Sequence, residues 1–162
     1  MLGDHCAENR ARGARTTENY DVDADNPVVQ LCADGTAAER RGDFAQAMEL
    51  FERAWTGAVD DYDRCIAAHY LARHQDGPQP TLEWNERCLR LALNVNDERV
   101  RRFFPSLYLN IGRSHEQLGD RQAALASYLQ AQSSQCVLGD DPYGTMLRDR
   151  ITRAIQRTEG AK

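Results

Sequence analysis

Cysteine and histidine side chains that could carry chemistry gather in the middle of the sequence. Cys65 and His69 are four residues apart, so on a helix they would share one face. A thiolate and an imidazole at this spacing can ligate zinc, and Cys88 and His115 could approach as further ligands from neighbouring helices. No dense ligand motif accompanies them, so packing residues are the competing interpretation. We adopt that interpretation and predict no metal and no cofactor.

The neighbouring His69, Tyr70 and His74 are also residue types that serve in acid–base catalysis. Their spacing does not place them beside a nucleophile with a base and an orienting partner. The glycines of the chain are isolated, so no phosphate-binding loop is present in the sequence. We therefore predict that the protein is not an enzyme.

The composition argues against nucleic-acid and membrane partners and indicates the compartment of the protein. The 162 residues suffice for one domain with its own core, and the net charge of -5 argues against nucleic-acid binding. The five cysteines are odd in number and widely spaced, so we expect no disulfide framework and a reducing cytoplasm. No apolar run has the length of a signal peptide or a membrane span, which predicts no membrane partner. Lys162 is the only lysine, a bias typical of GC-rich bacterial genomes.

Two stretches of the sequence repeat one pattern of small, aromatic and turn residues. In the first stretch the pattern comprises Leu31, Gly35, Ala38, Gly42, Ala47, Phe51 and Ala54. In the second it comprises Tyr108, Gly112, His115, Gly119, Ala124, Tyr128 and Ala131. Each stretch predicts a helix, a tight Gly-Asp turn and a second helix that packs back on the first.

Helix start and stop signals divide the rest of the chain. Residues 1–25 are polar and end in an acidic run, so we predict a flexible N-terminal tail ahead of a helical domain at 26–158. Asn26-Pro27 is a helix start signal, and a middle hairpin has Pro80 at the start of its second helix. For Pro105 we prefer a kinked, lengthened helix from residue 98 to a new helix that starts at the proline. Further helices are expected at 27–41, 61–75, 120–135 and 142–157.

These hairpins resemble the tetratricopeptide repeat (TPR) family, most clearly in the first and third. The resemblance implies an all-α fold: three TPR-like hairpins and a C-terminal capping helix in a short right-handed superhelix. It also implies a non-enzymatic protein–protein interaction module, an adaptor or scaffold. The stretches 69–75 and 105–110 are similar to small actinobacterial TPR proteins.

In TPR proteins the first helix of each hairpin lines a concave groove that takes a peptide or a helix. Carried onto this chain, the main groove residues are Thr36, Arg40, Tyr70, Arg73, His74, Asn110, Arg113 and Gln117. Further groove positions are Glu39, Asp63, Ile66, Ser106 and Leu109. The clamp of chaperone-tail-binding TPR domains is broken, since Cys32, Thr36 and Ala67 replace its Lys and Asn residues. The resemblance therefore does not imply binding to chaperone C-termini.

Two other functions remain open. A regulatory sensor for a small ligand or a metal could use Tyr70, Arg73, His74 and the Cys65–His69 pair. A homo-oligomer could form through an apolar face near Phe103 and Phe104. A basic patch beside that face consists of Arg99, Arg101 and Arg102. It could dock a partner, but we favour the alternative that the arginines lie on a solvated helix face and the phenylalanines in the core.

Overall fold

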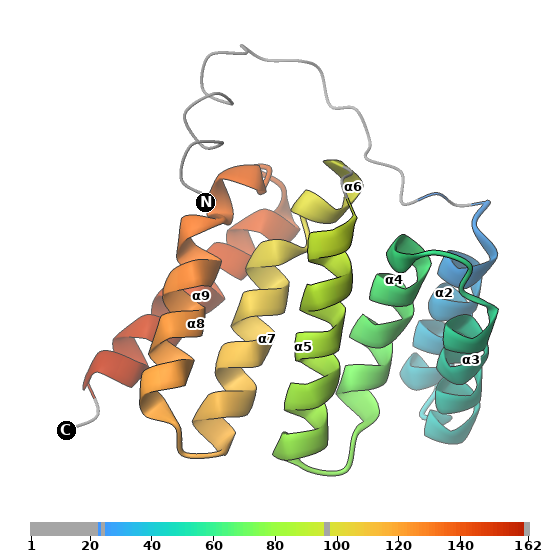
Figure 1. Cartoon of the computed structure of the whole chain (residues 1–162), viewed down its shortest axis with the longest axis horizontal. Coiled ribbons are helices and arrows are strands. Elements are labelled where there is room, and N and C mark those ends of the chain that lie inside the picture. Colours follow the sequence, from blue (N-terminus) through green and yellow to red (C-terminus); the bar gives the residue numbers. More distant parts are fainter. Residues whose placement is uncertain (1–22, 24, 96–97, 161–162) are drawn as a thin grey trace. The chain divides into compact units, whose positions relative to one another are not determined.

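The computed structural model describes residue 23 and residues 25–95 and 98–160, and all regular structure in these ranges is helical (Figure 1). This confirms the predicted all-α class. The flexible tail predicted for residues 1–25 lies almost wholly outside the described residues. Contacts divide the chain into two compact units, within Asp21–Val100 and Arg101–Lys162, which we call the N-terminal and C-terminal units.

The N-terminal unit contains two helical hairpins. The helices of the first hairpin are α2 (Pro27–Arg40) and α3 (Phe44–Gly57). The second hairpin consists of α4 (Asp61–Leu71), the short 3-10 helix η1 (Ala72–His74) and α5 (Pro78–Asn94). Helix α4 packs on both helices of the first hairpin as well as on α5.

Local signals set the start of α2 and the turn that follows it. The Asn26 side chain accepts hydrogen bonds from the backbone of Val28 and Val29, so it caps the first turn. Gly42 adopts φ 82°, a conformation that side chains disfavour. Asp43 then accepts from the Gln46 amide at 3.0 Å and starts α3. The predicted cap and Gly-Asp turn are confirmed.

The first hairpin closes around one glycine and one aromatic ring. Ala47, Phe51 and Ala54 of α3, which belong to the repeated pattern in the sequence, are fully buried. Gly35 of α2 lies against the Phe51 ring so closely that a Cβ atom at this position would collide with it. The glycine is therefore needed for close approach of the two helices.

The middle hairpin differs from the prediction at its turn. Helix α4 ends at Leu71 and continues as η1, whereas we expected an α-helix to residue 75. Helix α5 begins at Pro78, not at Pro80. Gly77 turns the chain with φ 100°, and Pro78 suits the first helical position because that position needs no amide hydrogen.

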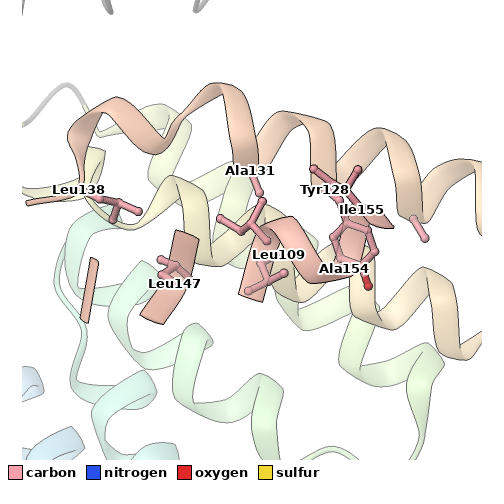
Figure 2. Close-up of a cluster of buried hydrophobic side chains, with 9 residues drawn as sticks. Leu109, Tyr128, Ala131, Leu138, Leu147, Ala154 and Ile155 are labelled. Atoms are coloured by element: carbon pink, nitrogen blue, oxygen red, sulfur yellow. The ribbon is translucent and has the colours of Figure 1, made fainter. Parts of the chain in front are cut away.

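The C-terminal unit is a hairpin closed by one long helix. It contains α7 (Phe104–Gln117), α8 (Arg121–Ser133), the 3-10 helix η2 (Gln135–Val137) and α9 (Pro142–Gly160). Side chains of α7, α8 and α9 form one buried cluster, in which Leu109, Tyr128, Leu147 and Ile155 converge (Figure 2). Gly112 lies against the Tyr128 ring as Gly35 does against Phe51. The predicted closing helix thus covers the third hairpin.

The expectation of a kinked helix through Pro105 is wrong. A separate short helix, α6 (Glu98–Arg101), ends before α7 begins at Phe104, with Pro105 in the first turn of α7. Proline in that turn loses no hydrogen bond, whereas in a continuous helix it would remove one and clash with the preceding turn. Phe103 and Phe104 are half-buried, and Phe104 stacks on Tyr108 with ring centroids 6.3 Å apart.

The cysteines are used in two ways. Cys32, Cys65 and Cys88 are free and buried, where they pack as small apolar groups. Cys136 is disulfide-bonded, which the spacing of the cysteines did not predict. None of the described helices combines the length and apolar content that crossing a membrane requires.

Candidate functional site

Four of the predicted groove residues gather around Glu39 in the N-terminal unit. Nη2 of Arg73 donates to both carboxylate oxygens of Glu39, at 2.9 and 2.7 Å. Nε2 of His74 lies 2.7 Å from Glu39 Oε1. We call Thr36, Glu39, Tyr70, Arg73 and His74 the Glu39 cluster. It joins α2 to the end of α4 and to η1.

Aromatic rings pack against the side chains of the Glu39 cluster. Tyr70 stacks on Phe51 with ring centroids 5.1 Å apart, and His74 lies 5.2 Å from the same ring. The Arg73 guanidinium lies 4.7 Å from the centre of the Tyr70 ring, within the range of a cation–π contact. The side chains of Arg73 and Glu39 are 40% and 20% exposed. The cluster is therefore fixed by packing but open to solvent on the arginine side.

Burial sets the protonation of groups within and beside the cluster. Desolvation, with a smaller contribution from Arg73, lowers the pKa of His69 to about 4. Burial raises the pKa of the Cys32 thiol to about 12, against a smaller opposite effect of Arg73. Burial also raises the pKa of Tyr70. These three groups are uncharged at neutral pH, so the pair of Arg73 and Glu39 dominates the local field.

Arg40 lies beside the cluster but does not join it. It is exposed at the C-terminal end of α2 and forms no hydrogen bond or ion pair within the described ranges. Thr36, in contrast, donates its hydroxyl to the Cys32 carbonyl at 2.9 Å. The cluster and Arg40 together present two guanidinium groups and one carboxylate.

The other three predicted groove residues lie on α7 in the C-terminal unit. Asn110, Arg113 and Gln117 are spaced by three and four residues and so share one helix face. Arg113 and Gln117 are exposed and Asn110 is half-buried. Among the residues that the structure describes, the side chains of these three residues form no hydrogen bond, and the Asn110 carbonyl accepts from the Ser114 hydroxyl at 3.2 Å. The predicted set thus falls into two groups, one in each unit.

Three further groove positions have structural roles instead. Asp63 is buried and accepts from the Asn26 side chain at 2.6 Å and from the Val59 amide at 3.2 Å. Ile66 and Leu109 are buried as well, Leu109 in the core of the C-terminal unit. These positions pack or cap helices, so their assignment to a groove is wrong.

Of the residues proposed as possible zinc ligands, two cysteines lie in contact. The Sγ atoms of Cys65 and Cys88 lie 3.6 Å apart, and Cys88 donates to the Cys65 carbonyl. His115 lies on α7, in the C-terminal unit. Within 25–95 and 98–160, no three His, Cys, Asp or Glu side chains gather in a way that could hold a metal ion.

A second glutamate that the sequence did not single out, Glu116, binds an arginine and a tyrosine in the C-terminal unit. Glu116 accepts from Arg157 at 2.7 Å through both oxygens and from the Tyr128 hydroxyl at 2.7 Å. The sequence could have indicated this role, because Glu116 occupies the same place in the third hairpin as Glu39 in the first. The hydrogen bonds from Arg157 lower the pKa of Glu116 to about 2, with Tyr128 as a smaller contributor.

Comparisons with known proteins agree with the helical hairpins. Residues 105–135 match the model of the family described as tetratricopeptide repeat. No curated protein sequence matches the chain significantly. Among solved structures, the crystal structure of PcrH from Pseudomonas aeruginosa matches with a TM-score of 0.52 at 16% identity, over 82% of this chain and 91% of that chain. The structural match shows a fold of this helical-repeat type, and the family match covers the third hairpin.

Proposed function

We propose that the protein is a non-enzymatic adaptor that binds a peptide or helix of another protein on the exposed first helices of its hairpins. In the N-terminal unit the contacting residues are Thr36, Arg40, Tyr70, Arg73 and His74. In the C-terminal unit they are Asn110, Arg113 and Gln117. The tetratricopeptide match supports this proposal because repeat helices of that family serve as interaction surfaces.

The observation that carries the proposal is the arrangement of Arg73. Its guanidinium is held by Glu39 and by the Tyr70 ring, yet the side chain stays 40% exposed. An arginine already fixed before binding loses little conformational entropy when a partner arrives. Arginine and tyrosine are also among the residue types that dominate interface energetics.

The charges indicate the chemistry of the partner segment. Arg40 and Arg113 are exposed and have no ion-pair partner within the described stretches. Arginine binds carboxylates through two parallel hydrogen bonds, and the amides of Asn110 and Gln117 can bind peptide backbone. The surfaces therefore suit a segment that carries Asp or Glu.

The sensor hypothesis has weaker support at these residues. Nη2 of Arg73 and Nε2 of His74 already contact Glu39, so a small ligand that needs these two nitrogens would have to displace that carboxylate. A metal-binding sensor has no ligand set among the residues that the structure describes. We therefore retain the peptide-binding adaptor as the proposed function.

Affinity capture with mass spectrometry tests this proposal, with Arg40→Glu and Arg113→Glu as separate variants. Neither substitution removes a hydrogen bond of the described structure, so both proteins should keep wild-type circular dichroism. Arg90→Glu, on the exposed face of α5, is the control. We expect one protein to be captured by wild type and by the control but lost from at least one groove variant. Equal capture by all four proteins would contradict the proposal.

A second step defines the bound segment. Overlapping peptides of the captured protein are titrated into the full chain by calorimetry. We expect binding to concentrate in one acidic peptide and to weaken about tenfold for each lost arginine contact, or about 1.4 kcal/mol. Peptides that bind wild type and the groove variants equally would place the interface elsewhere.

A further inference from the structure

The N-terminal unit has a cleft between α3, α4 and α5 that the proposed function does not use. Its volume is about 460 Å³, within the usual range of small-molecule sites. Eight residues line it: Met48, Glu52, Trp55, Thr56, Leu71, Gln75, Trp84 and Arg87. None of them belongs to the Glu39 cluster or to the predicted groove. The cleft is therefore separate from the surface that the proposed function uses.

The floor of the cleft is aromatic and apolar. Trp55 and Trp84 meet edge to face with ring centroids 5.1 Å apart and an angle of 84° between their planes. Both rings are half-buried, and Leu71, which also lines the cleft, is buried. Half-exposed tryptophans offer a large apolar surface at little cost in conformational entropy, so they favour contact with an apolar group.

Two opposite charges stand at the same cleft without pairing. The Arg87 guanidinium lies 4.6 Å from the Trp84 ring centre and 5.7 Å from the Trp55 ring centre. Glu52 lines the cleft from α3. Within the part of the chain that the structure describes, neither Glu52 nor Arg87 forms an ion pair or a hydrogen bond. The cleft thus offers an acceptor for a cation and a donor for an anion.

We propose that this cleft binds a free α-amino acid with a large apolar side chain, such as leucine. The ligand carboxylate pairs with Arg87, its ammonium pairs with Glu52, and its side chain packs on Trp55 and Trp84. A simple anion would be repelled by Glu52 and a simple cation by Arg87, whereas a zwitterion satisfies both. Half of the eight lining residues are polar or charged and half are apolar or aromatic, which suits a ligand that combines two charges with an apolar side chain.

The chain offers a direct reporter for this site. Its two tryptophans are Trp55 and Trp84, and both line the cleft, so all tryptophan fluorescence comes from there. L-leucine is titrated into the full chain to about 10 mM, which would reveal a Kd of about 1 mM. We expect a saturable change in emission. No change over this range would overturn the proposal.

Blocked ligands separate a free amino acid from a peptide. N-acetyl-L-leucine lacks the ammonium group, and L-leucinamide lacks the carboxylate. We expect each to bind at least tenfold more weakly than L-leucine by calorimetry. If N-acetyl-L-leucinamide binds as tightly as L-leucine, the cleft recognises a peptide segment or an apolar group, and the zwitterion proposal is wrong.

Neutral variants test the two charges on the protein side. Glu52→Gln and Arg87→Gln should each raise the Kd for L-leucine about tenfold in calorimetry, with unchanged circular dichroism. Glu49→Gln and Arg90→Gln, exposed on the same two helices, are the matched controls and should bind as wild type. Unchanged leucine affinity in both cleft variants would rule out the proposed pairing. Arg40→Glu should leave leucine binding intact, so this test is independent of the groove.

Discussion

The first and third hairpins share the same contact between their two helices but differ in the side chains that bind a glutamate at the equivalent position, Glu39 in the first and Glu116 in the third. In each, a helical glycine lies against a buried aromatic ring: Gly35 against Phe51 and Gly112 against Tyr128. In each, a glutamate one turn after the glycine is bound by an arginine from a later helix.

The difference lies in the ring. Phe51 has no hydroxyl, so Glu39 takes its additional partner, His74, from the neighbouring hairpin. Tyr128 donates its own hydroxyl to Glu116 inside its hairpin. The glutamate of the third hairpin is therefore held by its own repeat and the closing helix, whereas Glu39 depends on the next repeat and leaves a part-exposed arginine available to a partner.

The largest effect is expected from removal of the rings. Phe51→Ala and Tyr128→Ala should each lower the free energy of unfolding by about 3–5 kcal/mol, because both rings are fully buried. Chemical denaturation with hydrogen exchange measures the loss and shows which unit opens first. Phe44→Ala is the control and should change little, since Phe44 is 62% exposed. A loss below about 1 kcal/mol for either ring would contradict the shared architecture.

The next largest effect concerns the two glycines. Gly35→Ala and Gly112→Ala should each cost about 1–3 kcal/mol, because the added Cβ collides with Phe51 or Tyr128. Gly57→Ala has open space around its Cβ and should be neutral or stabilise the helix by up to about 1 kcal/mol. Thermal unfolding of the three variants is sufficient. If Gly35→Ala is as stable as Gly57→Ala, the close contact is not required.

Exchange of the rings sharpens the comparison further. Tyr128→Phe should cost about 1.5 kcal/mol, because it removes a hydrogen bond to a charged carboxylate. Phe51→Tyr should bring no gain, since Arg73 and His74 already engage Glu39. Urea unfolding of both variants provides the measurement. Equal stabilities for both exchanges would show that the hydroxyl does not distinguish the hairpins.

The smallest effect is expected in the loss of folding stability at acidic pH. The folded pKa of Glu116 is lowered to about 2, below the usual value for glutamate, chiefly by hydrogen bonds from Arg157. A lowered folded pKa stabilises the protein above the unfolded pKa, and this stability is lost as the pH falls from about 4.3 towards 2. Thermal unfolding of wild type should therefore decline more steeply over this range than that of Glu116→Gln. Glu159→Gln should retain the wild-type slope, and equal slopes for all three would contradict the assignment.

The sequence predicted those parts of the fold that depend on local chemistry. Asn26, Gly42 and Asp43 act through their own backbone neighbours, so their types were sufficient to place the turn. The structure at Pro105 was harder to predict, because the local sequence is compatible both with a kinked helix and with a new helix that starts there. Only the packing of the residues around it decides between them.

The candidate site was predictable only as a set of helix faces. Periodicity placed Tyr70, Arg73 and His74 on one stretch, but it could not show that Glu39 of an earlier helix binds two of them. The same limit explains the wrong assignment of Asp63, whose partner Asn26 lies 37 residues away. Contacts between distant segments depend on tertiary packing, which periodicity does not contain.

The bond between Asn26 and Asp63 also has a consequence for synthesis on the ribosome. Asn26 caps α2, and its amide donates to a carboxylate on α4 that also accepts from the Val59 amide. The start of the first repeat is thus completed by a residue translated well after it. During translation α2 and α3 can pair, but the first turn of α2 gains its full set of bonds only once Asp63 has left the exit tunnel. The first turn of the first repeat therefore reaches its final hydrogen bonding only after the start of the second repeat has been synthesised.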